Sequence, residues 1–311
     1  MTCHNCRSEC RKFGKRKNRQ RYQCQQCRKV FTDARDNTLD GMYTSVAAAT
    51  KALEMLLEGC SVSSVERLTG IHHTTLLKLL VLAGEKAEHL MAQKIRGIEV
   101  RDVECDEVWS FIQKKEKRVR PDDDPNFGDC YTFVAIERHS KLVLNIAMGK
   151  RDQSTTDVFI EGLRHATRGE FQITTDGFAP YRKAIPDTLG DRCDFAMLIK
   201  VYRAATGDEH RYSPPEVSNT EVVPVMGRPD PERICTSIVE RSNLSIRMGT
   251  RRFTRLTNAF SRKWENHWAA VSLWFGFYNF CRVHKSLRVT PAMAAGIADH
   301  IWSVRELLEA A

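Results

Sequence analysis

Three acidic residues that lie far apart in the chain share one setting, because each stands at the edge of an apolar segment. They are Asp106 in residues 104–111, Asp176 in residues 174–181 and Glu240 in residues 238–244. Carboxylate oxygens are the ligands that a hard divalent cation such as Mg²⁺ prefers, and such ions catalyse reactions of phosphate esters. If the fold brings the three carboxylates together, we expect a metal-dependent site that acts on phosphates.

The adjacent carboxylates of Asp106 and Glu107 cannot easily serve one ion if they lie on a strand. Side chains along a strand point alternately to its two faces. Asp106 then shares its face with Glu104 and Val108. Glu107 points the opposite way, together with Trp109. We therefore expect Asp106, and not Glu107, to bind the metal.

The other two acidic residues have neighbours that suit a phosphate-binding site. Asp176 follows a predicted strand and precedes Gly177, and functional side chains in α/β folds commonly lie beyond the carboxyl end of a strand. Glu240 is predicted to lie on a helix, which places Asn243 and Arg247 on the same face. Taken singly, each acid is as well explained by a surface charge or a salt bridge. Their joint occurrence favours a common site.

Four cysteines near the start have the spacing of a zinc ribbon. Two Cys-x-x-Cys pairs are separated by seventeen residues, and each pair can provide two of the four thiolates around a tetrahedral Zn²⁺. So short a segment buries too little apolar surface to fold alone, so the metal must supply free energy of folding. A redox pair is the alternative, and His4 and Cys10 are less regularly spaced substitute ligands. The predicted ligands of one structural Zn²⁺ in residues 1–40 are Cys3, Cys6, Cys24 and Cys27.

The segment between the two cysteine pairs interleaves basic residues with aromatic ones. Phe13 and Tyr22 stand among seven Lys and Arg residues in the stretch 11–22. Cations with aromatic neighbours are typical of a surface that contacts nucleic acid. The predicted DNA contacts are Arg16, Lys17, Arg19 and Arg21.

Residues 41–95 have the pattern of a helix-turn-helix domain. Ser63 and Glu66 form a predicted capping box at the start of one helix. Val65 and Leu68 are expected to face inward from that helix, and Gly70 allows a sharp turn after it. Helix, glycine-containing turn and helix is the plan of this DNA-binding motif.

The second helix of this domain is predicted to begin at His73. Its apolar face would pack inward, and its opposite face would meet DNA. The residues expected on the DNA face are His72, His73, Thr74, Thr75 and Lys78. A plain helical hairpin without DNA contacts is the alternative interpretation.

From residue 96 the pattern becomes that of an α/β domain. The predicted strands are 100–111, 130–136, 142–148, 171–175 and 195–202, with a helix over 154–167 capped by Ser154. An antiparallel meander followed by alternating helix and strand is the order of a ribonuclease-H-like domain. The predicted fold class is therefore α/β, with this domain at 96–298 preceded by the zinc ribbon and the helix-turn-helix.

Two stretches interrupt the predicted domain. Residues 203–232 contain five of the ten prolines and no apolar periodicity, so we expect an irregular insertion. Residues 114–129 are expected to form an exposed loop whose acids, Asp122, Asp123 and Asp124, are solvated. The tryptophan-rich region that follows should pack in the core at 273–278, and residues 299–311 are expected to form a C-terminal helix.

Charge is distributed unevenly along the 311 residues, whose formal net charge is +9. Residues 1–35 carry +9 and residues 240–290 carry +8, so the rest of the chain sums to −8. Basic segments on either side of acidic ones suit a protein that holds the phosphate backbone and keeps carboxylates for catalysis. Solvated charged faces are the plainer explanation of the same pattern.

Composition limits the class of protein. A hydrophobic content of 42% is normal for a globular chain of two or three domains. No long apolar run and no signal-peptide pattern is present, so we expect a soluble, cytoplasmic protein without membrane contact. The seven cysteines outside the zinc pattern are expected to be free thiols or small apolar residues.

The motifs together resemble the bacterial DDE transposases of the insertion-sequence-one type. The resemblance lies in Asp-Glu-Val-Trp-Ser-Phe at 106–111, Thr-Asp-Gly-Phe-Ala-Pro-Tyr at 175–181 and Val-Glu-Arg-Ser-Asn-Leu at 239–244. It extends to the amino-terminal modules and to the tail at 278–292, and so covers nearly the whole chain.

This resemblance implies a function. Asp106, Asp176 and Glu240 would be the catalytic triad and would bind two Mg²⁺ or Mn²⁺ ions. The partners would be the inverted-repeat ends of a mobile element and target DNA, handled by a homodimer or larger assembly. Phosphates would be held by Asn243, Arg241, Arg247, Arg251 and Arg252.

One departure from the family concerns spacing. The second aspartate and the glutamate usually lie close together, whereas the proline-rich stretch at 203–232 separates them here. An exposed loop can lengthen at little thermodynamic cost, so the site can survive the insertion. Two rival functions share these features: a DNA-binding transcription regulator with a non-catalytic core, and a ribonuclease-H-like nuclease that cuts without joining.

Overall fold

The computed structural model describes residues 2–3, 6, 8–16, 19–32, 37–39, 42–203, 216–254 and 258–310. These residues form two compact units, Met1–Val46 and Ala47–Ala311. Each unit is described by itself below. None of the helices in the described ranges is both long and apolar enough to cross a membrane.

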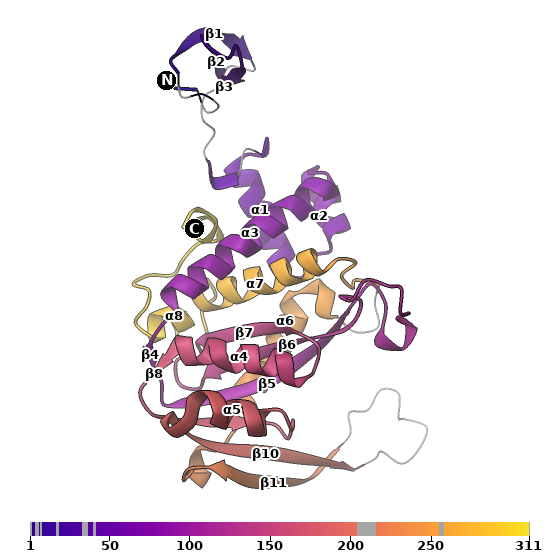
Figure 1. Cartoon of the computed structure of the whole chain (residues 1–311), viewed down its shortest axis with the longest axis vertical. Helices are drawn as coiled ribbons and strands as arrows, with labels where there is room; N and C mark the ends of the chain where they lie inside the picture. The colour runs from indigo at the N-terminus through magenta and orange to yellow at the C-terminus, as the bar shows by residue number, and fades with distance from the viewer. Residues whose placement is uncertain are drawn as a thin grey trace. The chain divides into compact units, whose positions relative to one another are not determined.

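The first unit is a small antiparallel sheet. Its elements are β1 (Cys10–Arg16), β2 (Arg19–Cys24), β3 (Val30–Thr32) and the short 3₁₀ helix η1 (Asn37–Leu39) (Figure 1). Cys10 pairs with Cys24 across β1 and β2, and Cys24 is fully buried. Cysteine side chains therefore take the central place that larger apolar residues occupy in an ordinary core.

Three helices follow, α1 (Val46–Leu57), α2 (Val62–Thr69) and α3 (His73–Lys94). The predicted turn and the predicted start of the second helix at His73 are present. Gly70 ends α2 with φ +70°, a left-handed conformation that glycine adopts without steric cost. The helical geometry agrees with the expected plan, and its role as a DNA-binding motif remains a prediction.

The predicted capping box of α2 is wrong. The N-cap is Ser61, whose hydroxyl accepts a hydrogen bond from the Ser64 backbone N–H at 3.0 Å. The Glu66 carboxylate reaches forward instead and accepts the His73 backbone N–H at 2.8 Å. Glu66 thus satisfies an otherwise unpaired N–H at the start of α3, since helix termini leave such groups without partners.

The inward orientation predicted for Leu68 is also wrong. Val65 is fully buried, but Leu68 is 67% exposed. α2 has only eight residues, and of the two residues predicted to face inward only Val65 reaches the core.

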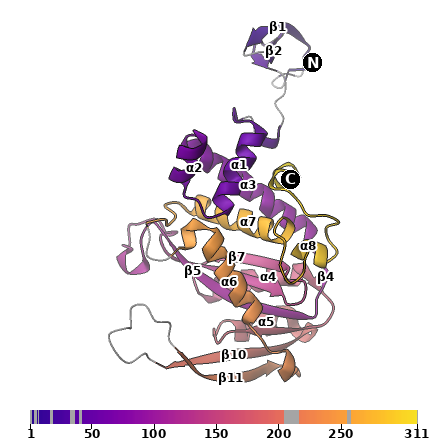
Figure 2. The same ribbon diagram turned by 180° about the vertical axis from the view of Figure 1, so that it is seen from behind.

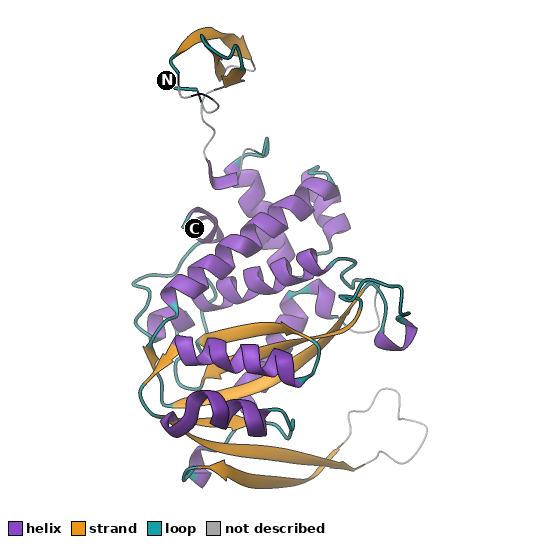
Figure 3. Ribbon diagram, viewed as in Figure 1, coloured by secondary structure: helices purple, strands orange, loops and turns teal. Residues whose placement is uncertain are grey.

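A six-stranded mixed sheet organises the second unit (Figure 3). Its strands are β5 (Asp102–Ile112), β6 (Gly128–Glu137), β7 (Val143–Gly149), β9 (Phe171–Thr175), β10 (Cys193–Arg203) and β11 (Glu216–Met226). The order across the sheet is β11-β10-β9-β5-β6-β7. β5, β6 and β7 form an antiparallel meander, and β9 and β10 run parallel to β5. The expected order of elements is thus present, together with a small parallel pair, β4 (Ile98–Glu99) and β8 (Thr167–Arg168).

Helices cover both faces of this sheet. The helices α4 (Gln153–Ala166) and α5 (Tyr181–Leu189) lie on one face, and α6 (Ser237–Gly249) lies on the other (Figures 1 and 2). The predicted cap of α4 is two residues too late. Asp152, not Ser154, is the N-cap, and its carboxylate accepts the Thr155 N–H at 2.9 Å.

The stretch predicted as an irregular insertion contains a regular strand. β11 pairs antiparallel with β10 over most of its length. Proline is tolerated on an edge strand because the missing N–H need not join the ladder, so Pro224 does not prevent pairing. The part of the predicted insertion at 204–215 lies outside the described residues.

The acidic loop at 122–124 is more ordered than expected. Asp123 is not simply solvated, because its carboxylate binds the Lys114 ammonium at 2.6 Å and the Arg120 backbone N–H at 2.7 Å. The loop is further shaped by the 3₁₀ helix η2 (Glu116–Arg118). Asp122 and Asp124 remain exposed as predicted.

The long helix α7 (Trp264–Phe280) packs beside α3 and supplies much of the core. Residues 273–278 are buried except for the partly exposed Phe277, as the sequence predicts. Two short helices, α8 (Pro291–Ala294) and α9 (Val304–Glu309), end the chain, and α9 is the helix expected in 299–311.

The contact between α3 and α7 depends on Gly84. A Cβ atom at this position would lie 2.5 Å from the Ala269 Cα and 2.6 Å from the Ala269 carbonyl oxygen. Backbone atoms cannot rotate away as a flexible side chain can. The absence of a side chain at Gly84 therefore sets how closely the two helices approach.

Gly84→Ala separates helix propensity from packing. Propensity alone would stabilise an exposed helix by about 0.5–1 kcal/mol, whereas overpacking costs about 1–3 kcal/mol. We expect the clash to dominate and the free energy of unfolding, measured in urea, to fall by about 1–2 kcal/mol. Glu85→Ala, at the exposed neighbouring position, should change it by less than about 0.5 kcal/mol. Equal or greater stability of Gly84→Ala would contradict the close approach.

Candidate active site

The site begins where the pairing between β5 and β9 ends. β5 pairs with β6 from Val103 to Ile112, but it pairs with β9 only from Asp102 to Cys105. β9 stops at Thr175, opposite Cys105. From Asp106 to Phe111, β5 therefore has no partner strand on its β9 side within the described residues, and this stretch of the strand has an open edge.

Three carboxylates converge at this open edge. One oxygen from each of Asp106, Glu107 and Asp176 lies within 4.8 Å of the others. Two of them come from the predicted set, and Asp176 follows the end of β9 as expected. An Asp176 oxygen accepts the Phe178 backbone N–H at 2.9 Å, which fixes the turn after the strand.

The expectation that Glu107 could not join Asp106 is wrong. The two side chains do leave β5 on opposite faces, since Asp106 meets α6 through Asn243 and Glu107 meets α5 through Tyr181. Alternation fixes the face on which a side chain leaves the strand, not the place that its end reaches. Here the missing strand lets both carboxylates reach the same space.

Glu240 lines the same cavity without belonging to the tightest cluster. The cavity has a volume of about 590 Å³ and is lined by Asp106, Glu107, Asp176, Glu240, Asn243 and Arg247, among others. One Glu240 oxygen accepts the Thr236 hydroxyl at 2.7 Å and also pairs with the Lys200 ammonium of β10. The three predicted acids thus face one cavity, with Glu240 held at its β10 side.

A carboxylate on β5 positions α6. Glu104 accepts the backbone N–H groups of Ile238 and Val239 at 2.8 and 2.9 Å, and these are orphan donors in the first turn of α6. Burial raises the pKa of Glu104 to about 6, although the Val239 and Ile238 N–H groups lower it. Sequence reasoning noted the face of Glu104 but assigned it no function.

The segment before α6 is also fixed to β5. Arg233, in the 3₁₀ helix η5 (Pro231–Arg233), places its Nε 2.8 Å from an Asp102 carboxylate oxygen. His139 bonds to the other Asp102 oxygen at 2.8 Å. Asp102 and Glu104 together lock the start of α6 against β5, and so position Glu240, which lies in the first turn of this helix.

Asn243 joins α6 directly to the acidic cluster. Its side-chain amide donates to Asp106 at 2.7 Å, and its own carbonyl oxygen is buried without a partner in the described part of the chain. Arg247, one turn on, lines the same cavity. This confirms that Glu240, Asn243 and Arg247 share a face of the helix.

The other predicted phosphate ligands lie farther along the same segment. Arg241 is exposed on α6. Arg251 and Arg252 belong to the 3₁₀ helix η6 (Arg251–Phe253) and face other cavities. Arg252 donates to the Ser261 hydroxyl at 2.9 Å. Their contact with DNA remains a prediction.

Two basic residues at the site could not be predicted from any motif in the sequence. Arg151, just after β7, bonds to Glu107 and Asp176 at 3.1 Å each and lies over the Phe178 ring at 4.1 Å. Lys200 pairs with Glu240 from β10. Each belongs to a motif-free stretch, so only the fold shows that they reach the carboxylates.

Burial and mutual repulsion shift the acidity of the cluster. Burial raises the pKa of Asp106 to about 6, and the nearby charges of Asp176 and Glu240 add to the rise against hydrogen bonds from the Glu107 backbone and Asn243. Burial likewise raises the pKa of Glu107 to about 7, with Asp176 adding and the Tyr181 hydroxyl opposing. A bound cation would relieve this repulsion, because it favours the ionised carboxylates.

The four predicted zinc ligands come together in the first unit. The Cys3 and Cys27 sulfurs are 3.5 Å apart, those of Cys6 and Cys24 are 3.4 Å apart, and all four lie within 4.8 Å. Cys10 bonds instead to the Ser8 carbonyl oxygen at 3.6 Å, and His4 lies outside the described residues. The arrangement suits one tetrahedral ion.

Thiol acidity in this cluster is uneven. The Ser8 backbone N–H is the main cause that lowers the pKa of Cys6 to about 6. The Lys29 backbone N–H lowers that of Cys27, but burial and the neighbouring thiols outweigh it and raise the pKa to about 11. Four thiolates so close together require a cation to neutralise them.

The DNA-binding residues predicted in the amino-terminal modules are only partly described. Arg16 and Arg19 end β1 and begin β2, and Lys17 lies outside the described residues. Arg21 is half-buried and lies 5.6 Å from the centre of the Phe13 ring. On α3, the residues Thr74 and Lys78 are exposed and Thr75 is half-buried.

Comparison with known proteins gives little at the level of sequence. No family model and no curated protein matches the chain. Among solved structures it is similar to the Mos1 transposase paired-end complex with left transposon end, at 12% identity and a TM-score of 0.23, over 53% of this chain and 62% of that one. It is also similar to the Mos1 strand transfer complex, at 13% identity and a TM-score of 0.22, over 49% and 57%. The chain thus spans about six-tenths of the length of the solved chains that it matches, and these TM-scores do not define a shared fold.

Glu107→Gln tests the repulsion within the cluster. The raised pKa means that folded wild-type protein holds a proton that the unfolded chain has lost, from the ordinary carboxyl range up to about pH 7. Its free energy of unfolding therefore falls as the pH rises through that window. Without added divalent metal, we expect the variant to be more stable than wild type by about 1–3 kcal/mol near pH 8, and equal to it near pH 4.

Denaturant titrations at the two pH values measure this difference. Glu58→Gln, which changes an exposed carboxylate, should leave stability unchanged at both. A variant that is less stable than wild type near pH 8 would show that the Arg151 ion pair outweighs the repulsion.

Removal of zinc tests the thiol cluster. Purified protein should contain one equivalent of Zn²⁺, released by a thiol-modifying reagent and detected with a colorimetric chelator. Cys24→Ser should lose most of the metal, because the residue is buried among the other three thiols. Cys60→Ser, outside the cluster, should retain it. Full zinc content in Cys24→Ser would exclude the predicted ligand set.

Proposed function

We propose that this chain is a DNA transposase that binds the ends of a mobile element, cleaves them and joins them to target DNA. One observation carries the proposal: the acids of three distant motifs, Asp106, Asp176 and Glu240, face a single cavity. The proposed catalytic domain is ribonuclease-H-like. Its support is the observed antiparallel meander followed by two parallel strands.

The donor set of the cavity fits Mg²⁺ or Mn²⁺. Its acidic side chains offer hard oxygens, those of Asp106, Glu107 and Asp176 lie within 4.8 Å of one another, and burial makes the charges of Asp106 and Glu107 costly without a cation. We assign Asp106, Asp176 and Glu240 as the metal ligands, with Glu107 within reach of the first two. When bound, the metal would supply Lewis-acid activation of the attacking oxygen and stabilisation of the leaving oxygen.

The residues of the chain would orient the DNA phosphate. Asn243 donates to one Asp106 oxygen and the Glu107 backbone N–H donates to the other at 2.8 Å, so the orientation of this carboxylate at the cavity is fixed. Arg247 and Lys200 line the same space and would bind the non-bridging phosphate oxygens. Lys200 would have to leave Glu240 to do so, since the two are paired.

The reaction would proceed by two displacements at phosphorus. In the first, water attacks the phosphodiester at the element end, its oxygen bonds to phosphorus, and the 3′-oxygen leaves as a hydroxyl. In the second, this 3′-hydroxyl attacks a phosphodiester of the target strand and displaces the target's own 3′-oxygen. Each step breaks one phosphorus–oxygen bond and forms one.

Recognition of the element ends is assigned to the amino-terminal modules. The zinc ribbon would contact DNA with Arg16, Lys17, Arg19 and Arg21, and α3 would contact it with Thr74, Thr75 and Lys78. The exposed positions of Thr74 and Lys78 support this assignment. Since two ends must be handled together, we expect a homodimer or larger assembly on DNA.

A strand-joining assay tests the proposal. Purified protein is incubated with a labelled element-end duplex, a target plasmid and Mg²⁺ or Mn²⁺. Wild type should give joined products, and Asp176→Ala should lower their yield by about a hundredfold or more, since metal ligation supplies several kcal/mol. Asp122→Ala, which removes an exposed acid that does not line the cavity, is the matched control and should retain full activity.

The rival functions are distinct outcomes of the same assay. Cleavage without joined products would identify a nuclease, and binding with neither product would identify a regulator. Full joining by Asp176→Ala would refute the assigned triad.

A further inference from the structure

A second cavity lies farther along the open edge of β5, beyond the carboxylates. Its volume is about 620 Å³, and four aromatic side chains line it: Trp109, Phe111, Phe253 and Phe260. The ring centres of Trp109 and Phe111 are 5.8 Å apart, and those of Phe111 and Phe260 are 5.0 Å apart. Trp109, Phe111 and Phe260 are partly exposed, so a ligand can reach part of their apolar surface. The Lys115 ammonium lies 5.9 Å from the centre of the Trp109 ring and would have to move for a base to stack there.

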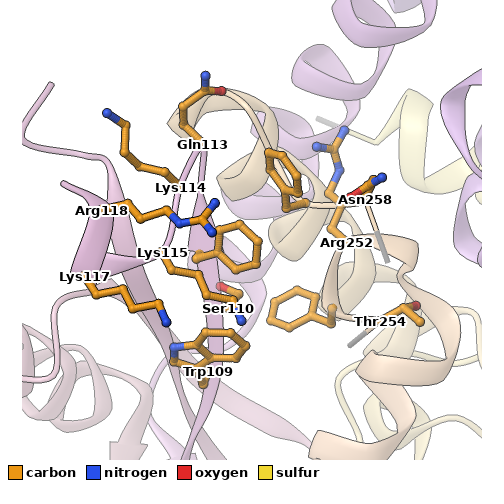
Figure 4. Close-up of a pocket in the computed structure, with 13 residues that line it drawn as sticks. Trp109, Ser110, Gln113, Lys114, Lys115, Lys117, Arg118, Arg252, Thr254 and Asn258 are labelled. Carbon is orange, nitrogen blue, oxygen red and sulfur yellow. The ribbon is translucent and has the colours of Figure 1, made fainter. Parts of the chain in front are cut away.

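The rest of the lining is polar and includes five cations, of which Lys114 is paired with Asp123. Lys115, Lys117 and Arg118 stand on one side of the aromatic rings, and Arg252 stands on the other (Figure 4). No carboxylate is among the described residues that line the cavity. The one acid of the same turn, Glu116, is engaged elsewhere, because it binds the Lys150 ammonium at 2.8 Å. The cavity therefore suits a ligand with both negative charge and a flat ring.

The cationic wall at Arg252 is built into the fold. Arg252 donates to the Ser261 hydroxyl, which also bonds to the buried His267 ring at 2.9 Å. The other nitrogen of that ring bonds to the Ser110 hydroxyl of β5 at 3.0 Å. Arg252 is thus held in place through a buried chain of polar contacts, and binding need not restrict its side chain further.

The position of the cavity relates it to the candidate active site. Trp109 and Phe111 lie three and five residues beyond Asp106 on the same strand. At about 3.3 Å per residue, this is about 10–17 Å. A nucleic-acid strand advances about 3.4 Å per nucleotide in a duplex, so the distance corresponds to about three to five nucleotides.

We propose that this cavity binds an unpaired base of a DNA strand, stacked on Trp109 and Phe111 with its phosphates held by Lys115, Lys117 and Arg118. A base inside a duplex cannot reach such a pocket, because its faces are covered by its neighbours. Aromatic rings and cations in one groove are the means by which proteins bind single strands without reading sequence. That the strand belongs to an element end or its target rests on the proposed function.

Binding of two matched oligonucleotides tests the proposal on the full-length protein without added Mg²⁺ or Mn²⁺. One is a fluorescein-labelled short oligothymidylate, and the other is a strand of the same length with abasic sites, which keeps the phosphates but lacks the bases. Wild type should bind the base-bearing strand at least about fivefold more tightly, the lower limit expected for one stacked base. Equal affinity for the two strands would overturn the proposal.

Variants locate the preference within the cavity. Trp109→Leu combined with Phe111→Leu should abolish the preference for bases and leave affinity for the abasic strand unchanged. Phe260→Leu, on a different segment, should reduce the preference and serves as a second test if the double variant does not fold. Tyr43→Leu, a 90% exposed aromatic outside the cavity, should keep the wild-type preference. A preference that survives both cavity variants would place the base elsewhere.

Charge variants separate the phosphate contacts from the stacking. Lys115→Ala combined with Lys117→Ala should weaken binding of both strands equally and reduce the slope of log affinity against log salt by about 1.4, the value for two phosphate contacts on a single strand. An unchanged slope would remove these lysines from the site. Base preference and strand joining are independent readouts. A preference for bases without joined products would support this cavity as a base-binding site and refute the transposase function. Joined products without a preference for bases would support the transposase function and refute base binding in this cavity.

Discussion

The early end of the pairing between β5 and β9 is the constraint on which the rest of this structure depends. Because β9 stops opposite Cys105, the stretch of β5 from Asp106 to Phe111 has no partner strand on that side in the described part of the chain. That gap brings Asp106 and Glu107 into one space despite their opposite orientation. It also exposes Trp109 and Phe111 a few residues on. The carboxylate cavity and the aromatic cavity are two consequences of the same missing strand.

The elements around the gap are held by buried charge. Glu104 and Asp102 bind the start of α6 and the segment before it, and Asn243 returns from α6 to Asp106. Such contacts position the carboxylates at the expense of stability, since burial raises the pKa of Glu104 and Asp106 to about 6. The ionised carboxylates repel one another in this site. Divalent cations favour the ionised carboxylates, so the site is suited to bind them.

Local patterns predicted much of this arrangement. Asp106, Asp176 and Glu240 were identified by type and by their place at element edges, and the helical spacing of Glu240, Asn243 and Arg247 put them on one face. The predictions that failed concern contacts between residues that are distant in sequence. Strand alternation excluded Glu107 because it gives the face on which a side chain leaves the strand, not the reach of its carboxylate around an open edge. The prolines at 203–232 concealed β11 because an edge strand tolerates them. Arg151 and Lys200 lie in stretches without a motif, so no local signal could place them at the site.

The central claim is that folding gathers Asp106, Asp176 and Glu240 around shared divalent metal. Cleavage of the backbone by hydroxyl radicals, generated at Fe²⁺ that replaces Mg²⁺, tests it directly, because such radicals cut only near the bound ion. The account predicts cuts close to all three residues, suppressed by excess Mg²⁺ and lost together in Asp176→Ala. Cuts near one of the three alone, or a pattern that Asp176→Ala leaves unchanged, would contradict it.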